Sequence, residues 1–296
     1  MSPAETHFEE CFYESSDGLS LYYRDYAEAR APGATNEVPP PVLCLPGLTR
    51  NSRDFASIAE HLAATRRVLC LEFRGRGRSQ HDPVTANYVP PTYANDVVTL
   101  IDHLSLDRVI LLGTSLGGIV SMLLASIVPG RIGGVVLNDM GAVIDPKGLA
   151  RIGSYAGKQG PVDSWQGAVA QARETNELAF PGKSDEWWLE FSRKVYREDA
   201  TGQVVLDYDP AIGEAARNTG RPTDPNAGWS LFEALMPIPT LLLRGETSDI
   251  LSREVALEMT KRKPGLVLTE IPGVGHAPML EEPDATQAID GFLASV

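Results

Sequence analysis

The sequence predicts an α/β protein whose mostly parallel sheet is covered by helices on both faces. Short apolar runs, too short for helices, are typical of buried parallel strands, and they occur at residues 42–45, 67–73, 109–112, 135–137 and 240–243. Segments with helical spacing of apolar residues, such as 55–62 and 93–104, lie between them. Right-handed crossovers between such strands produce a doubly wound sheet.

The remaining segments fit the same architecture. Residues 8–13 and 19–26 flank a Ser-Ser-Asp-Gly turn, which predicts an antiparallel hairpin at one edge of the sheet. Ser52 is the expected N-cap of the helix that ends at residue 62. A surface connection is expected at 31–41, a last strand at 266–271 and a closing helix at 283–293.

Size and charge limit the possible functions. The chain has 296 residues, 43% of them hydrophobic, which is enough for one large domain with an insertion. Its formal net charge of −13 argues against binding to nucleic acid or to an anionic membrane surface. We therefore expect a small-molecule substrate and no nucleic-acid or membrane partner, while the oligomeric state stays open.

The sequence carries no sign of export. Residues 1–10 lack a basic region followed by an apolar one, and the apolar stretch at 119–128 is far shorter than the roughly 20 residues that cross a bilayer. The three cysteines, Cys11, Cys44 and Cys70, show no Cys-x-x-Cys spacing. These features predict a cytoplasmic protein with reduced thiols.

One pentapeptide stands where a buried strand passes directly into a helix. Gly113-Thr114-Ser115-Leu116-Gly117 follows the apolar run 109–112 and precedes a helical segment that Pro129-Gly130 ends. A serine at such a sharp turn needs small neighbours, which the two glycines supply. The motif resembles the nucleophile elbow of the α/β-hydrolase superfamily, with Ser115 as the nucleophile.

This resemblance implies a fold and a domain division. It implies an α/β-hydrolase core with a mostly parallel eight-stranded sheet, formed by residues 1–144 and 231–296, and an inserted helical cap at 145–230. The segment 74–79, Arg-Gly-Arg-Gly-Arg-Ser, is similar to a turn signature of the family, with Glu72 where aspartate is usual. The resemblance implies no cofactor and no metal.

The resemblance also implies a catalytic triad in the chain order serine, acid, histidine. Ser115, Asp249 and His276 each lie just beyond a predicted strand, and such strand ends converge in space. His276 would act as the general base, and Asp249 would orient it. Asp139, after the preceding core strand, is the rival for the acid, and Glu246 is a weaker one.

Two backbone N–H groups are expected to form the oxyanion hole. They belong to Leu116, which follows the nucleophile, and to Leu48, in the loop after the strand 42–45. Pro46 occupies the place where relatives commonly have histidine, but the donor at Leu48 is backbone and is unaffected.

The expected activity is hydrolysis of carboxylic esters or lactones through an acyl-enzyme at Ser115. The aromatic residues of segment 145–230, which holds all four tryptophans, favour an apolar or aromatic substrate. Arg50 or Arg53 would bind a substrate carboxylate. Two alternatives remain: a hydrolase of carbon–carbon bonds in diketone ring-cleavage products, and a ligand-binding protein without turnover.

Overall fold

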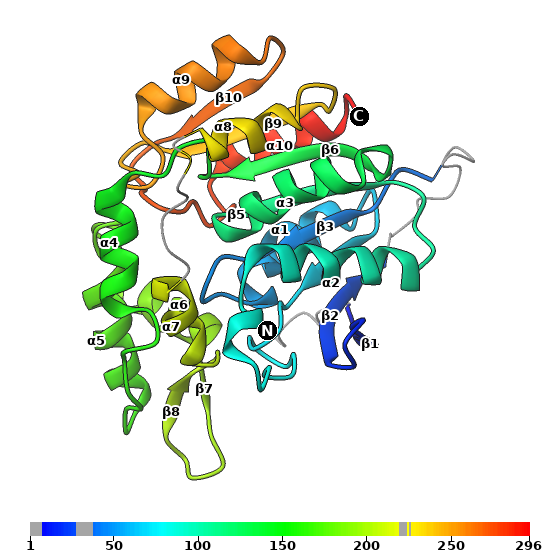
Figure 1. Cartoon of the computed structure of the whole chain (residues 1–296). Coiled ribbons are helices and arrows are strands. Elements are labelled where there is room, and N and C mark those ends of the chain that lie inside the picture. Colours follow the sequence, from blue (N-terminus) through cyan, green and yellow to red (C-terminus); the bar gives the residue numbers. More distant parts are fainter. Residues whose placement is uncertain (1–7, 28–37, 219–223, 225) are drawn as a thin grey trace.

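The computed structural model describes residues 8–27, 38–218, 224 and 226–296. The first seven residues and most of the expected connection 31–41 lie outside this range. One eight-stranded sheet forms the centre (Figure 1), in the order β1-β2-β4-β3-β5-β6-β9-β10. β1 pairs antiparallel with β2, β2 pairs antiparallel with β4, and the other pairs are parallel. The strands are β1 Glu9–Glu14, β2 Ser20–Tyr26, β3 Val42–Leu45, β4 Val68–Leu71, β5 Val109–Thr114, β6 Ile132–Asn138, β9 Thr240–Gly245 and β10 Val267–Ile271.

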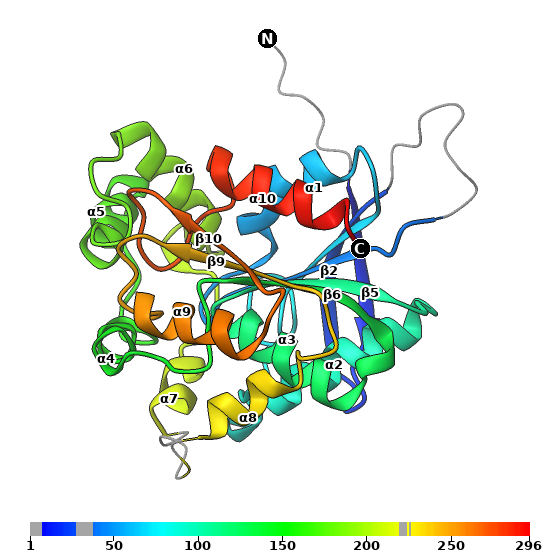
Figure 2. The ribbon, with the colours of Figure 1, turned by 90° about the horizontal axis from the view of Figure 1, so that it is seen from above.

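Helices cover both faces of this sheet, as Figure 2 shows. One face carries α1 (Ala56–Leu62) and α10 (Pro283–Leu293), and the other carries α2 (Pro90–His103), α3 (Leu116–Ile127), α8 (Ala227–Glu233) and α9 (Arg253–Arg262). Each face has its own apolar core. Every residue of β3, β4 and β6 is buried, which agrees with the continuous apolar runs expected of strands covered on both sides. The predicted doubly wound sheet is confirmed.

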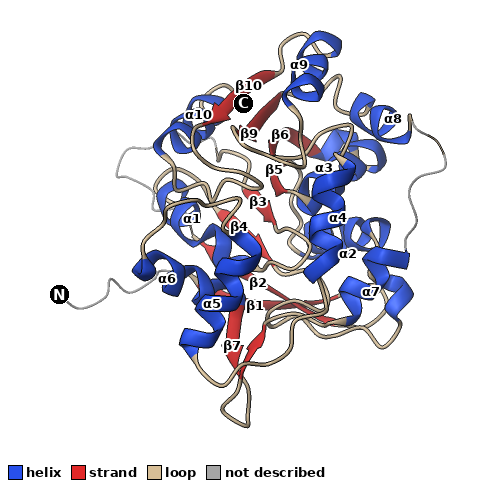
Figure 3. Ribbon diagram, turned by 90° about the vertical axis from the view of Figure 1, so that its left-hand side faces the viewer, coloured by secondary structure: helices blue, strands red, loops and turns tan. Residues whose placement is uncertain are grey.

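The chain between β6 and β9 leaves the sheet and packs over the carboxyl ends of the strands (Figure 3). It forms α4 Pro146–Tyr155, α5 Trp165–Asn176, α6 Asp185–Val195, β7 Tyr196–Glu198, β8 Val204–Leu206 and α7 Ala211–Asn218. β7 and β8 form a separate antiparallel hairpin. The division into core and cap at residues 145 and 230 stays a prediction. Helix α8 extends across the second boundary and packs on α3.

The start of the first core helix differs from the sequence prediction. The side chain of Asn51, and not that of Ser52, accepts the capping hydrogen bond, from the N–H of Arg53. The Ser52 hydroxyl donates to the buried Glu72 carboxylate at 2.6 Å. The same carboxylate accepts from the N–H of Arg78, so Glu72 holds the 74–79 turn against the helix start. Segment 74–79, which is similar to a turn signature of the family, therefore has a structural role, as expected.

Arg76, in this turn, is buried completely and reaches the loop after β3. Its Nε donates to the carbonyl oxygen of Leu48 at 2.9 Å, and its Nη1 donates to the Tyr93 hydroxyl at 2.9 Å. The guanidinium carbon lies 4.7 Å from the centre of the Tyr93 ring, within cation–π distance. Arg76 therefore fixes the peptide that follows Leu48.

Among the described residues, no helix combines the length and the apolar character needed to span a membrane.

Candidate active site

Ser115 lies at the turn between β5 and α3 in a conformation that side chains rarely adopt. Its φ is +53°, in the left-handed region. The turn is this tight because backbones approach closely on both sides: a Cβ on Gly113 would lie 2.3 Å from the carbonyl oxygen of Gly117, and one on Gly117 would lie 2.0 Å from that of Leu45. Glycine at both positions is therefore required for the turn that presents the Ser115 hydroxyl.

His276 lies in the loop between β10 and α10 and contacts the serine. Its Nε2 is 2.8 Å from Ser115 Oγ, and the histidine side chain is only 7% exposed. The loop is anchored by Asn138, whose side-chain amide donates to the carbonyl oxygen of Pro278 at 2.9 Å and to Thr114 Oγ1 at 3.0 Å. One buried amide thus ties the ends of β5 and β6 to the histidine loop.

The acid beside His276 is Asp139, and the choice of Asp249 for this contact is corrected. Asp139 Oδ2 lies 2.7 Å from His276 Nδ1, and the carboxylate is fully buried. A carboxylate only accepts hydrogen bonds, so Nδ1 carries the proton and Nε2 is left free to accept from Ser115. Asp139 follows β6, which neighbours β5, so the acid and the serine lie at adjacent strand ends.

Asp249 is occupied elsewhere. Both of its oxygens accept from Arg151 of α4, at 2.5 and 2.8 Å, in a two-point ion pair between the β9–α9 loop and the chain over the sheet. Partial burial opposes ionisation of Asp249, but the hydrogen bonds and charge of Arg151 outweigh it and lower the pKa of this carboxyl. Sequence spacing gave no sign of this pairing, because Arg151 belongs to the inserted segment. Glu246 accepts from the N–H of Gly273 and is likewise not in contact with the His276 ring.

Ser248 is a site residue that the sequence analysis missed. Its hydroxyl donates to Asp139 Oδ2 at 2.6 Å and accepts from the N–H groups of Ile250 and Leu251. The N–H of Gly245 donates to Asp139 Oδ1 at 2.9 Å. With His276 Nδ1, three donors therefore surround the buried Asp139 carboxylate and fix its position. The only signal in the sequence was that Ser248 lies in the β9–α9 loop, one residue before Asp249.

Both residues expected at the oxyanion hole are near Ser115: Leu116 directly follows it, and Leu48 lines the same pocket. Leu116 is the first residue of α3, so its N–H lies outside the hydrogen-bond ladder of that helix. Leu48 lines the same pocket as Ser115, and the neighbouring Gly47 approaches so closely that a Cβ there would lie 3.7 Å from the Ser115 Cβ. The Arg76 contact to the Leu48 carbonyl holds this loop from behind.

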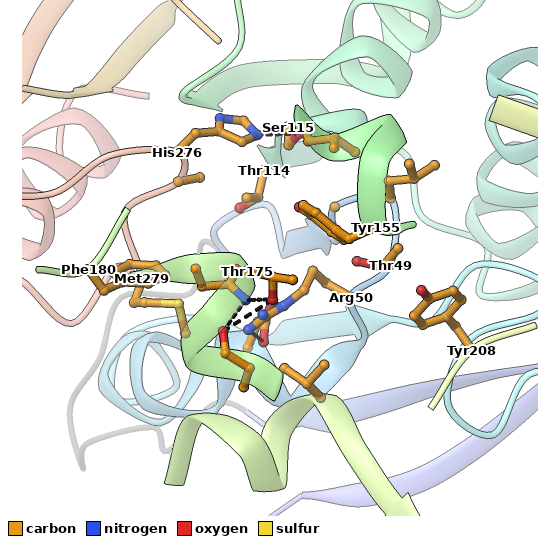
Figure 4. Close-up of a pocket in the computed structure, with 18 of the residues that line it drawn as sticks. Thr49, Arg50, Thr114, Ser115, Tyr155, Thr175, Phe180, Tyr208, His276 and Met279 are labelled. Atoms are coloured by element: carbon orange, nitrogen blue, oxygen red, sulfur yellow. Dashed lines mark hydrogen bonds and ion pairs between the residues drawn. The ribbon is translucent and has the colours of Figure 1, made fainter. Parts of the chain in front are cut away.

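Ser115 and His276 open into a pocket of about 920 Å³, including the part open to solvent. Figure 4 shows Phe180 and Met279 at one end of the lining and Tyr208 at the other, with Tyr155 between Tyr208 and Ser115. Partial burial raises the pKa of Tyr155, so its hydroxyl stays protonated at neutral pH. The lining is mixed, with polar groups from Thr49, Thr175 and Asn176 among the apolar ones.

The tryptophans of segment 145–230 have other roles. None of the four belongs to the described lining of this pocket. Trp187 and Trp188 pack against Phe180 and Phe191, with ring centres 5.0 to 6.5 Å apart. Trp229 lies beneath the guanidinium of Arg262 at 3.8 Å. Phenylalanine and tyrosine, and not tryptophan, supply the aromatic surface of the pocket.

The two arginines expected to bind a carboxylate are both paired within the protein. Arg50 lines the pocket, and its Nε and Nη2 each donate to Asp54 at 2.6 Å, above the ring of Phe191. Arg53 donates to Asp207 at 2.5 Å and to the carbonyl oxygen of Lys194 at 3.1 Å, and it is not among the described lining residues. The charge of Arg50 is therefore neutralised by Asp54 where it faces the pocket. Arg53 connects the start of the first core helix to the segment between β6 and β9.

Within the described ranges, no cluster of three or more His, Cys, Asp or Glu side chains is arranged to hold a metal ion.

Comparison with known proteins agrees with this fold. The family model described as alpha/beta hydrolase fold matches residues 40–283. The 3-hydroxybutyrate-oligomer hydrolase of Cupriavidus necator is 34% identical over 249 residues, covering 82% of this chain and 84% of the relative, and the esterase YbfF of Escherichia coli is 29% identical over 262 residues, covering 86% and 92%. The crystal structure of an alpha/beta hydrolase from Novosphingobium aromaticivorans superposes with a TM-score of 0.90 at 39% identity, covering 98% of this chain and 99% of that one. The chain therefore belongs to the α/β-hydrolase family.

Proposed function

We propose that the protein hydrolyses carboxylic esters through an acyl-enzyme at Ser115, with His276 as general base and Asp139 as the acid that orients it. The observation that carries the proposal is the continuous chain of contacts from Ser115 Oγ to His276 Nε2, 2.8 Å, and from His276 Nδ1 to Asp139 Oδ2, 2.7 Å, at a pocket wall. Geometry of this kind recurs in unrelated serine hydrolases.

The first half of the reaction forms the acyl-enzyme. His276 Nε2 takes the proton of Ser115 as its oxygen attacks the ester carbonyl carbon, and Asp139 stabilises the resulting imidazolium. The carbonyl oxygen becomes an oxyanion, which the N–H groups of Leu48 and Leu116 would bind. Loss of one such donor costs about 2.7–4 kcal/mol of transition-state stabilisation. The imidazolium then protonates the departing alkoxide.

The second half returns the enzyme to its starting state. Water attacks the acyl-enzyme while His276 Nε2 accepts its proton, and the acid is released when Ser115 takes that proton back. The proposal extends to the substrate class of the Cupriavidus necator relative, which is named for hydrolysis of 3-hydroxybutyrate oligomers. Linear esters of short 3-hydroxy acids are therefore the first natural-type substrates to test, and simple lactones the second.

The test combines labelling with turnover. We expect a fluorophosphonate probe to modify Ser115 and p-nitrophenyl butyrate to be hydrolysed, with both signals abolished in Ser115→Ala. Absence of labelling and of turnover in the folded parent protein would reject the proposal and favour the ligand-binding alternative. Cleavage of a vinylogous diketone without ester turnover would instead favour carbon–carbon bond hydrolysis.

A further inference from the structure

A second cavity adjoins the pocket that Ser115 and His276 line. It has a volume of about 670 Å³, including the part open to solvent. Its walls come from the 157–161 segment that follows α4, from the β7–β8 hairpin, and from His81 of the core. Neither Ser115 nor His276 lines it, so the proposed ester chemistry does not use this space.

The two cavities share part of their lining. Gln159, Leu206 and Tyr208 line both, so they stand at the junction between the cavities. The junction is firmly built: the Tyr208 hydroxyl accepts from the N–H of Gly157 at 2.9 Å, and the Tyr208 side chain is buried. Tyr208 also forms a backbone bridge with Arg76, the residue that holds the Leu48 carbonyl. The second cavity therefore adjoins the Tyr208 end of the catalytic pocket.

The chemistry of the second cavity suits a chain that is apolar along its length and polar at its end. Pro161, Val205 and Pro210 supply apolar walls. Arg197, His81 and Asp199 supply polar groups to the same lining. Arg197 and His81 are about half exposed; Arg197 lies 3.0 Å from Asp207, and His81 lies 3.6 Å from Asp209. An oligoester of a short hydroxy acid has this character, because methyl-bearing units alternate with ester groups and one end is a carboxylate.

We propose that the second cavity is a substrate subsite that receives the units of a linear hydroxy-acid oligomer lying beyond the ester bond cut at Ser115. The inference rests on the proposed function and adds a preference to it. Phe180 and Met279 lie at one end of the catalytic pocket and Tyr208 lies at the other (Figure 4). In this proposal one side of the scissile bond faces Phe180 and Met279, and the other side extends past Tyr208 into the second cavity. The enzyme therefore favours oligomers long enough to reach Val205 over simple esters.

The test fills the second cavity from either wall. Val205→Trp adds a ring from β8, where an aromatic residue suits a strand. Gly160→Trp adds one from the opposite segment, where a Cβ meets no atom within 4 Å. Gln203→Trp is the matched control, since Gln203 is an exposed residue of the same hairpin and is not part of the described lining. Thermal unfolding of each variant checks the fold.

We expect kcat/KM of the parent to rise from the dimer to the trimer and tetramer of 3-hydroxybutyrate. Both cavity-filling variants should lose about tenfold or more of kcat/KM on the longer oligomers, mainly through KM, because a blocked subsite removes binding contacts. Their rates on p-nitrophenyl butyrate should stay within about twofold of the parent. The control should match the parent on every substrate.

The outcomes separate this inference from the proposed function. Turnover of p-nitrophenyl butyrate with no dependence on oligomer length, or unchanged oligomer kinetics in both folded variants, overturns the subsite and leaves the ester hydrolase standing. An equal loss on short and long esters also overturns it, because the substitution then acts on the catalytic groups. Absence of Ser115 labelling and of all ester turnover rejects the proposed function and the subsite together.

Discussion

Replacement of Asp139 by asparagine is the sharpest test of which carboxylate serves His276. Asp139 has φ +54°, a conformation that asparagine tolerates better than most residues, so Asp139→Asn keeps both shape and backbone. One oxygen remains to accept from the N–H of Gly245. The other becomes an NH₂ group that faces His276 Nδ1 and Ser248 Oγ, both of which act as donors in the parent.

The expected loss of kcat in Asp139→Asn follows from a change in the tautomer of His276. The amide donates to His276 Nδ1, so the ring proton moves to Nε2, which then no longer accepts from Ser115. The same change in a Ser-His-Asp triad lowers kcat by about 10⁴, or about 5.5 kcal/mol at 1.36 kcal/mol per decade. Asp249→Asn should leave kcat within about threefold, because it removes a charge from the Arg151 pair and leaves His276 with Asp139.

The assay is steady-state hydrolysis of p-nitrophenyl butyrate by the parent and the two variants, with circular dichroism and thermal unfolding as checks on folding. The reasoning is refuted if folded Asp139→Asn retains most of its kcat while Asp249→Asn loses several orders of magnitude. Such a result would return the acid to the position that the sequence order favoured.

Three further changes probe the residues around the triad. Ser248→Ala removes one of three donors to Asp139 and should lower kcat about tenfold at neutral pH with KM little changed, since a hydrogen bond to a charged group contributes about 1.5–3 kcal/mol. An unchanged kcat would contradict the role of Ser248 in positioning Asp139. Arg76→Met removes the donor to the Leu48 carbonyl and should reduce kcat about 10–100-fold in whatever fraction folds, measured after correction for active sites titrated with a fluorophosphonate; a loss confined to KM would count against it. Arg151→Met removes the ion pair with Asp249, whose pKa is lowered in the folded state, so the pair stabilises the fold fully above about pH 4 and progressively less as the pH falls through the folded-state pKa. In denaturant unfolding, the variant should have a lower free energy of unfolding than the parent at pH 7, and this difference should narrow in acid. A difference in unfolding free energy that widens in acid would disprove the coupling.

Much of the sheet could be predicted from the sequence because its signals are local. Buried strands such as β3 and β5 read as apolar runs, and Ser115 is marked by the glycines at the turn that only glycine can make. His276 followed from its place after the last strand. These features depend on residues that are neighbours in the chain.

The acid could not be chosen by the same means. Asp139 and Asp249 both follow core strands, and only the three-dimensional paths of the loops decide which carboxylate meets the imidazole. What separates them is Arg151, which lies in the inserted segment and has no recognisable spacing from Asp249. The residues that line the two cavities could not be predicted for a similar reason, because side chains of α4, α5 and the β7–β8 hairpin meet there only after the segment between β6 and β9 folds over the sheet.

The position of Asp139 at the end of β6 has a consequence for how this protein can change. The proposed nucleophile, Ser115, and the proposed acid, Asp139, follow two adjacent parallel strands, and the N–H of Ser115 donates to the carbonyl oxygen of Asn138, the residue before Asp139. From the β9–α9 loop, the Ser248 hydroxyl donates to Asp139, whereas the neighbouring Asp249 forms an ion pair with Arg151 of α4. Chimaeras that exchange residues 145–230 together with Asp249 should therefore keep the contacts among Ser115, His276 and Asp139.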